Sequence, residues 1–149
     1  MAGSSAQVTY DQGYNHDGGV GHVRRIVIDW TSDDTTGAVT ATTKKIVGQL
    51  IKVVTNPGAT APTDNYDIVI SDADGLDLLS SLALGAAVAP TLANRDTADT
   101  EVVHLWALSV VTTGFPLTGT APIVCSTLSV AVTNAGNSKQ GQIVIYYVV

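Results

Sequence analysis

The feature that most constrains the fold is an alternation of apolar residues with polar or small ones, which recurs along most of the chain. Within residues 20–30, Ile26, Ile28 and Trp30 are separated by single residues and share one side of an extended backbone. Successive side chains of a strand point to opposite faces of a sheet, so this period of two predicts half-buried strands. The same pattern predicts further strands at 39–42, 45–55, 66–72, 101–111, 123–133 and 142–149.

The composition agrees with a fold built from strands. Thr and Val make up about a quarter of the chain, and Glu101 is its only glutamate. Thr and Val lose side-chain freedom in helices, and few good helix formers are available for exposed positions. At most one short helix is expected, between Leu76 and Ala89. Seven or eight strands separated by frequent turns predict an all-β protein, an antiparallel β-sandwich or jelly roll.

The first 19 residues differ from the rest of the chain. They are rich in Gly, Ser, Asp and Asn, and we interpret residues 1–19 as an extended N-terminal arm and residues 20–149 as a single β-domain. Val8, Tyr10 and Tyr14 recur in the arm with polar residues between them. We expect these three to form an interface, by adding the arm to a sheet edge of a neighbouring subunit. The free arm is expected to be mobile.

The charge content restricts the partners. Charged residues are 13% of the chain, against about 25% in average domains. So sparse a charge predicts that other subunits cover part of the surface. The chain has seven basic residues and a net charge of −6, which is too little positive charge for a phosphate-binding patch. No nucleic acid is therefore expected as a partner. No membrane is expected either, because no run of apolar residues is long enough to span one.

Two groups of charged residues are candidate sites. Asp72, Asp74 and Asp77 could supply oxygens to Ca²⁺, but their spacing does not match a calcium-binding loop, and Asp-Gly after a strand is typical of a turn. We favour the turn and expect no metal and no cofactor. Arg95 is a lone cation among acids, and we expect a structural ion pair with Glu101 or one of the aspartates before it.

No pattern of catalytic residues stands out. His16, His22 and His104 are far apart in the sequence, and Cys125 has no nearby partner that would activate it. Nucleophile, phosphate-loop and metalloprotease motifs are absent from the sequence. We therefore do not expect an enzyme.

Three central blocks of the sequence resemble a known family. They are GQLIKVVTNPG (48–58), APTDNYDIVISDADGLD (61–77) and ANRDTADTE (93–101). The chain resembles, over residues 23 to 149, small structural proteins encoded among the head genes of tailed bacteriophages, known as head decoration or cement proteins. The resemblance implies a compact β-domain, bound as a dimer or trimer to the major capsid protein on the capsid exterior of the virion. It implies no catalytic residues.

Synthesis in the host cytoplasm fits this reading, since the sequence has one cysteine and shows no signal peptide. Two other classes stay open. One is a different virion protein of the tail, neck or baseplate. The other is a glycan-binding β-sandwich, for which the few aromatic residues are weak support.

Overall fold

The protein is built from strands that are antiparallel to their neighbours. The computed structural model describes residues 3–11, 23–75, 78, 92–95, 101–104, 110–112, 115–117 and 123–149. The strands are β1 (Ser5–Asp11), β2 (Val23–Thr31), β3 (Val39–Thr42), β4 (Ile46–Pro57), β5 (Tyr66–Ser71), β6 (Leu92–Arg95), β7 (Glu101–His104), β8 (Val110–Thr112), β9 (Phe115–Leu117), β10 (Ile123–Ser126), β11 (Ser129–Thr133) and β12 (Gln140–Val148).

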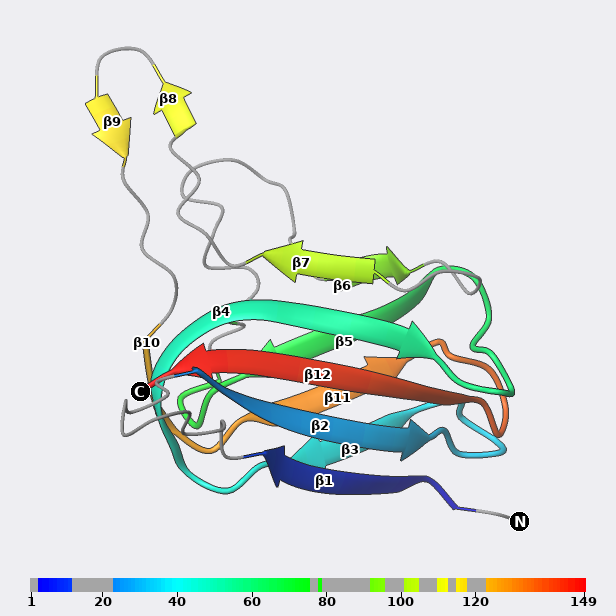
Figure 1. Cartoon of the computed structure of the whole chain (residues 1–149). Helices are drawn as coiled ribbons and strands as arrows, with labels where there is room; N and C mark the ends of the chain where they lie inside the picture. The colour runs from blue at the N-terminus through cyan, green and yellow to red at the C-terminus, as the bar shows by residue number, and fades with distance from the viewer. Residues whose placement is uncertain are drawn as a thin grey trace.

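Two sheets form a sandwich (Figure 1). The six-stranded sheet has the order β1-β2-β12-β4-β10, with β7 also paired to β4, and the four-stranded sheet has the order β3-β11-β5-β6. Strands β8 and β9 pair only with each other. The described residues contain no helix, and the segment expected to hold one, 76–89, lies outside them except for Leu78. The expected all-β antiparallel sandwich is confirmed.

The core lies between the two sheets because each contributes one apolar face. Ile26 and Ile28 of β2 and Ile68 of β5 are at most 1% exposed. The two faces meet at a pair of aromatic rings, Trp30 and Tyr66, whose centroids are 6.1 Å apart. Both rings are buried. Removing so much apolar surface from water is the main source of stability in a domain of this kind.

Two predicted strands are divided in the structure. The segment 123–133 becomes β10 in one sheet and β11 in the other, because the chain crosses the sandwich at Leu128. The β3–β4 connection crosses beside it: the Thr43 N–H donates to the Leu128 carbonyl, and the Leu128 N–H donates to Thr43 Oγ1, both at 2.9 Å. The segment 101–111 contains β7 and β8, and residues 105–109 lie outside the described residues.

Part of the N-terminal arm belongs to the sandwich. Residues 5–11, expected to be ordered only on a partner, form β1 and pair with β2 of the same chain from Ser5↔Thr31 to Asp11↔Arg25. Alternation turns Val8 and Tyr10 inward, where they pack against the core. The structure therefore differs from the expected free arm, because β2 has an edge that the arm completes. Tyr14 lies outside the described residues.

Candidate functional site

The outer face of the six-stranded sheet is divided into bands of different chemistry. Since β2, β12 and β4 turn one set of side chains into the core, the alternate set faces outward. The strand register joins Gln7 to Asp29, Asp29 to Gln142, and Gln142 to Asn56, on β1, β2, β12 and β4. We call these four residues the polar row. Sheet pairing places them in one row although Gln7 and Gln142 are far apart in the sequence.

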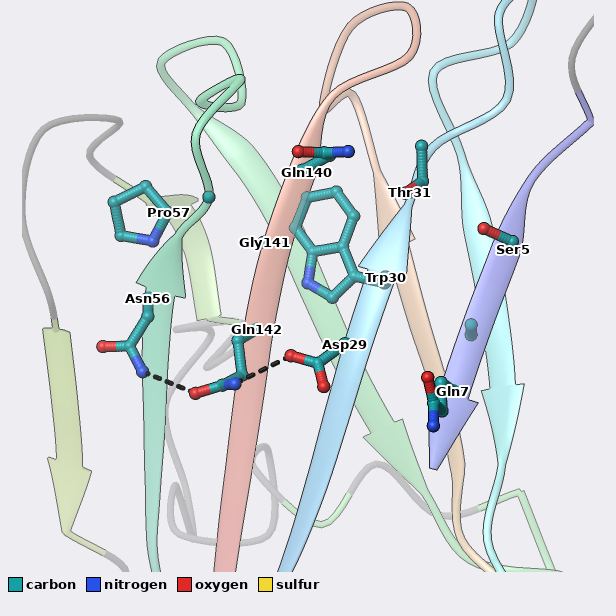
Figure 2. A pocket seen from close by; sticks show the side chains of 12 residues that line it. Ser5, Gln7, Asp29, Trp30, Thr31, Asn56, Pro57, Gln140, Gly141 and Gln142 are labelled. Atoms are coloured by element: carbon teal, nitrogen blue, oxygen red, sulfur yellow. Dashed lines mark hydrogen bonds between the residues drawn. The ribbon is translucent and has the colours of Figure 1, made fainter. Parts of the chain in front are cut away.

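A directed chain of hydrogen bonds runs along the polar row (Figure 2). Asn56 Nδ2 donates to Gln142 Oε1 at 3.2 Å, and Gln142 Nε2 donates to Asp29 Oδ1 at 2.7 Å. Because Asp29 only accepts, it fixes which end of the Gln142 amide points toward it, and Gln142 in turn orients Asn56. The three side chains are therefore held in defined positions on an otherwise solvated sheet face.

The polar row borders a pocket of about 650 Å³. Further lining comes from Ser5, Thr31, Pro57 and Gly141 (Figure 2). Gly58, which follows β4, also lines the pocket. The Gly58 N–H donates to the Gln140 carbonyl at 2.9 Å, which holds the end of β4 against β12. Among the described residues that line the pocket, Asp29 alone has a formal charge.

Gly141 sets the packing beneath the pocket. A Cβ atom at this position would lie 2.4 Å from Cζ2 and 2.7 Å from Cε2 of Trp30. The indole therefore occupies the space that any side chain on residue 141 would need. The buried Trp30 Nε1 has no hydrogen-bond partner. Trp30 thus supports the pocket by packing.

The opposite end of the same face is apolar. Val23, Val47 and Ile123 point outward from β2, β4 and β10, and Val149 follows β12 beside them. They are 48%, 54%, 78% and 50% exposed, and they are the exposed large hydrophobic side chains of the described residues. We call these four the apolar end. Cys125 is exposed and lies directly opposite Val47 in the pairing of β10 with β4, at this end.

Charged side chains lie between the two ends. Arg25 Nε donates to Asp11 Oδ2 at 2.8 Å, and Lys52 Nζ lies 4.2 Å from the centroid of the Tyr146 ring. The hydrogen bond to Asp11 is the main reason why the pKa of Arg25 is raised above its ordinary value. The contacts are exposed, so each contributes little to stability. They separate the pocket from the apolar end.

A second pKa shift lies in the β2–β3 connection. Asp33 Oδ1 accepts hydrogen bonds from the Thr36 N–H at 2.8 Å and the Thr35 N–H at 2.9 Å. These bonds, that of Thr36 first, lower the pKa of Asp33 below its ordinary value. Hydrogen bonds that close a turn explain this shift, so it does not mark a catalytic acid.

Asp72 and Asp74, two of the candidate calcium ligands, close a turn after β5. Asp72 Oδ1 accepts a hydrogen bond from the Asp74 N–H at 3.0 Å, and the Gly75 N–H donates to the Asp72 carbonyl at 3.1 Å. Asp77 lies outside the described residues. Within the part of the chain that the structure describes, no group of three or more His, Cys, Asp or Glu residues is placed to hold a metal ion.

We expect a calcium chelator to leave the melting temperature unchanged. A metal that binds only the folded protein would stabilise it, so removing such a metal would lower the melting temperature. Thermal unfolding followed by circular dichroism, with and without EDTA, measures this directly. A drop of several degrees with EDTA, restored by added Ca²⁺ but absent from an Asp72→Ala variant, would show that the aspartates of the turn hold the ion.

The other predicted residues are placed by their backbones. Arg95 is in β6 of the four-stranded sheet and Glu101 is in β7 of the six-stranded sheet. Their side chains, like that of His104, lie outside the described part, so the ion pair stays a prediction. His16 and His22 also lie outside it. The polar row was missed by sequence reasoning, because its members belong to four strands and form no motif.

Comparisons of the sequence with protein-family models and with curated proteins find no match. Within the described ranges, none of the secondary structure is a helix of the length and apolar character that crossing a bilayer demands. The outer face of the six-stranded sheet is therefore the feature on which a functional proposal rests.

Proposed function

We propose that the protein is a decoration protein of a tailed bacteriophage, which binds the outside of the assembled head and stabilises the capsid lattice. Its partners are the major capsid protein and further copies of itself, in a dimer or trimer. The three sequence blocks that resemble such proteins support this proposal. The proposed role is structural, and it involves no catalysis and no cofactor.

The apolar end is the observation that carries the proposal. Monomeric proteins rarely expose contiguous apolar patches without a function, and larger patches mark interaction sites. Here the exposed large hydrophobics of the described residues lie at one end of one sheet face, where the register places the starts of β2, β4 and β10 beside the end of β12. A stable interface buries about 800 Å² per partner, which is more than four side chains provide. Attachment through this end therefore requires additional surface, and a lattice of adjoining subunits offers it.

Binding of this kind stabilises a shell by mass action. A protein that binds the assembled lattice but not its free subunits shifts the equilibrium toward the assembled state. Several copies linked in one oligomer bind more tightly than one copy does, because the second contact is intramolecular. An apolar contact is enough for this role, provided that the copies are held side by side.

A charge placed in the apolar end is expected to weaken attachment to heads by about tenfold or more, since an unpaired lysine would have to be desolvated at the interface. Ile123→Lys is the variant of choice, because Ile123 is 78% exposed and the change does not disturb the core. Heads lacking the protein are mixed with increasing amounts of each variant and pelleted, and the bound fraction gives the apparent Kd.

Thr40→Lys is the matched control. Thr40 is an exposed residue of β3 in the four-stranded sheet, so the variant adds the same charge to the other layer. Equal attachment of Ile123→Lys and the unchanged protein would refute a role for the apolar end. Cryo-electron microscopy of native particles tests the location: copies spread over the shell support a decoration protein, whereas copies at one vertex or on the tail identify a neck, tail or baseplate protein.

A further inference from the structure

The pocket beside the polar row has no role in the proposed attachment through the apolar end. We infer that it binds a neutral, hydroxyl-rich ligand, that is, a saccharide. The inference concerns a separate end of the sheet face and does not depend on what the apolar end binds. It rests on the unused hydrogen-bonding groups of the polar row, on the charge of the pocket and on its open backbone.

The polar row presents donors and acceptors that the protein itself does not use. In the chain of hydrogen bonds, Asn56 uses one amide hydrogen and Gln142 uses its carbonyl oxygen and one amide hydrogen. Several groups are therefore left for a ligand. They are one N–H of Gln142, one N–H and the carbonyl oxygen of Asn56, and Oδ2 of Asp29. A sugar hydroxyl both donates and accepts, so it matches a surface on which donors and acceptors alternate.

The charge of the pocket disfavours anions and divalent cations as ligands. Asp29 alone is formally charged among the described lining residues, and its negative charge would repel phosphates and other anions. A single carboxylate among amides is a poor site for a divalent cation, which prefers several carboxylate or carbonyl oxygens. A carboxylate accepts two hydrogen bonds readily, which suits neighbouring hydroxyls of one sugar ring.

The position of the pocket disfavours a peptide. A peptide strand adds to a sheet through the free backbone groups of an edge. Here the centre of the row, Asp29 and Gln142, lies on β2 and β12, whose backbones are already paired on both sides. Recognition on this face must therefore come from side chains.

Shape supports the same ligand class. The volume of about 650 Å³ lies within the range of small-molecule sites. Gly58 places no side chain over the neighbouring Gln140, and Pro57 adds an apolar group to the lining. The site is open and has few aromatic groups, so single-site binding is expected to be weak. Linking several copies together would strengthen it by multivalency.

The test is a titration of the full-length protein with a panel of neutral oligosaccharides (lactose, maltotriose, cellotriose, mannotriose and chitotriose) at millimolar concentrations, followed by saturation-transfer NMR. At least one of them is expected to bind. Asp29→Ala and Gln142→Ala should each weaken that binding by about tenfold, the loss expected for a hydrogen bond to a charged group or for a broken chain. Both positions are on the surface, and circular dichroism verifies that the variants fold.

Asp74→Ala is the matched control, because Asp74 is an exposed carboxylate in the turn after β5, outside the pocket lining. It should bind the same sugar as tightly as the unchanged protein. Sialyllactose and a neutral peptide are added to the panel as competing ligand classes. The inference is overturned if no neutral sugar binds, if only sialyllactose or the peptide binds, or if the Asp29 and Gln142 variants bind unchanged.

Discussion

Replacing Gly141 with alanine is expected to lower the free energy of unfolding by about 3 kcal/mol or more, a large part of the 5–15 kcal/mol typical of a domain. The added Cβ would lie 2.4 Å from Cζ2 of Trp30, far inside van der Waals contact. The indole has no room to withdraw, because it is 4% exposed and packs against Tyr66 across the sandwich. Urea unfolding followed by far-ultraviolet circular dichroism gives the free energy difference.

Two further variants establish the cause of this loss. Gly3→Ala is the control, because a Cβ at residue 3 would have no atom within 4 Å, and its effect should stay within about 0.5 kcal/mol. Trp30→Phe removes the atoms that the new Cβ would strike. The double variant should therefore cost less than the sum of the two single variants, which is the signature of direct contact. Additive costs, or an unchanged Gly141→Ala protein, would contradict the packing described for Trp30.

The sequence alone predicts strands well where one face is buried and the other is solvated. The alternation at 20–30, 39–42, 45–55, 66–72 and 142–149 corresponds to β2, β3, β4, β5 and β12. It does not reveal where the chain passes from one sheet to the other. Val124, Leu128 and Val130 keep the same period on both sides of the crossing, because both sheets face a common core. The alternation of apolar and polar residues indicates which residues are buried. It does not indicate which sheet a residue belongs to.

The pocket could not be predicted from the sequence, for a related reason. Asp29 and Gln142 each look like an ordinary outward-facing residue of a strand. Only the register of β2 against β12 brings them together, and register depends on long-range pairing. The β1 strand is an intermediate case. Ala6, Val8 and Tyr10 do alternate with polar residues, but three apolar positions in a polar segment are a weak signal.

The second large effect is expected for Val8→Asp, which should cost about 2 kcal/mol or more of stability in the free protein. Val8 packs against the core from β1, and an aspartate there would have to be buried without a partner or pull the strand away. Because β1 is an edge strand and, among the described strands, pairs with β2 alone, it can detach while the rest stays folded. The cost of the substitution is therefore limited to what β1 contributes, and deleting residues 2–11 measures that limit.

Thr9→Asp distinguishes this arrangement from an arm that is free until it binds a neighbour. Thr9 is exposed on the same strand, one residue from Val8, so the two variants add the same charge to opposite faces. If β1 belongs to its own sandwich, Val8→Asp should approach the effect of the deletion and Thr9→Asp should change the urea midpoint very little. If the arm is ordered only on a partner, neither variant nor the deletion should alter the unfolding of the isolated chain. Equal midpoints for all of them would therefore contradict the pairing of β1 within its own chain. They would favour the arm that adds to a sheet edge of a neighbouring subunit.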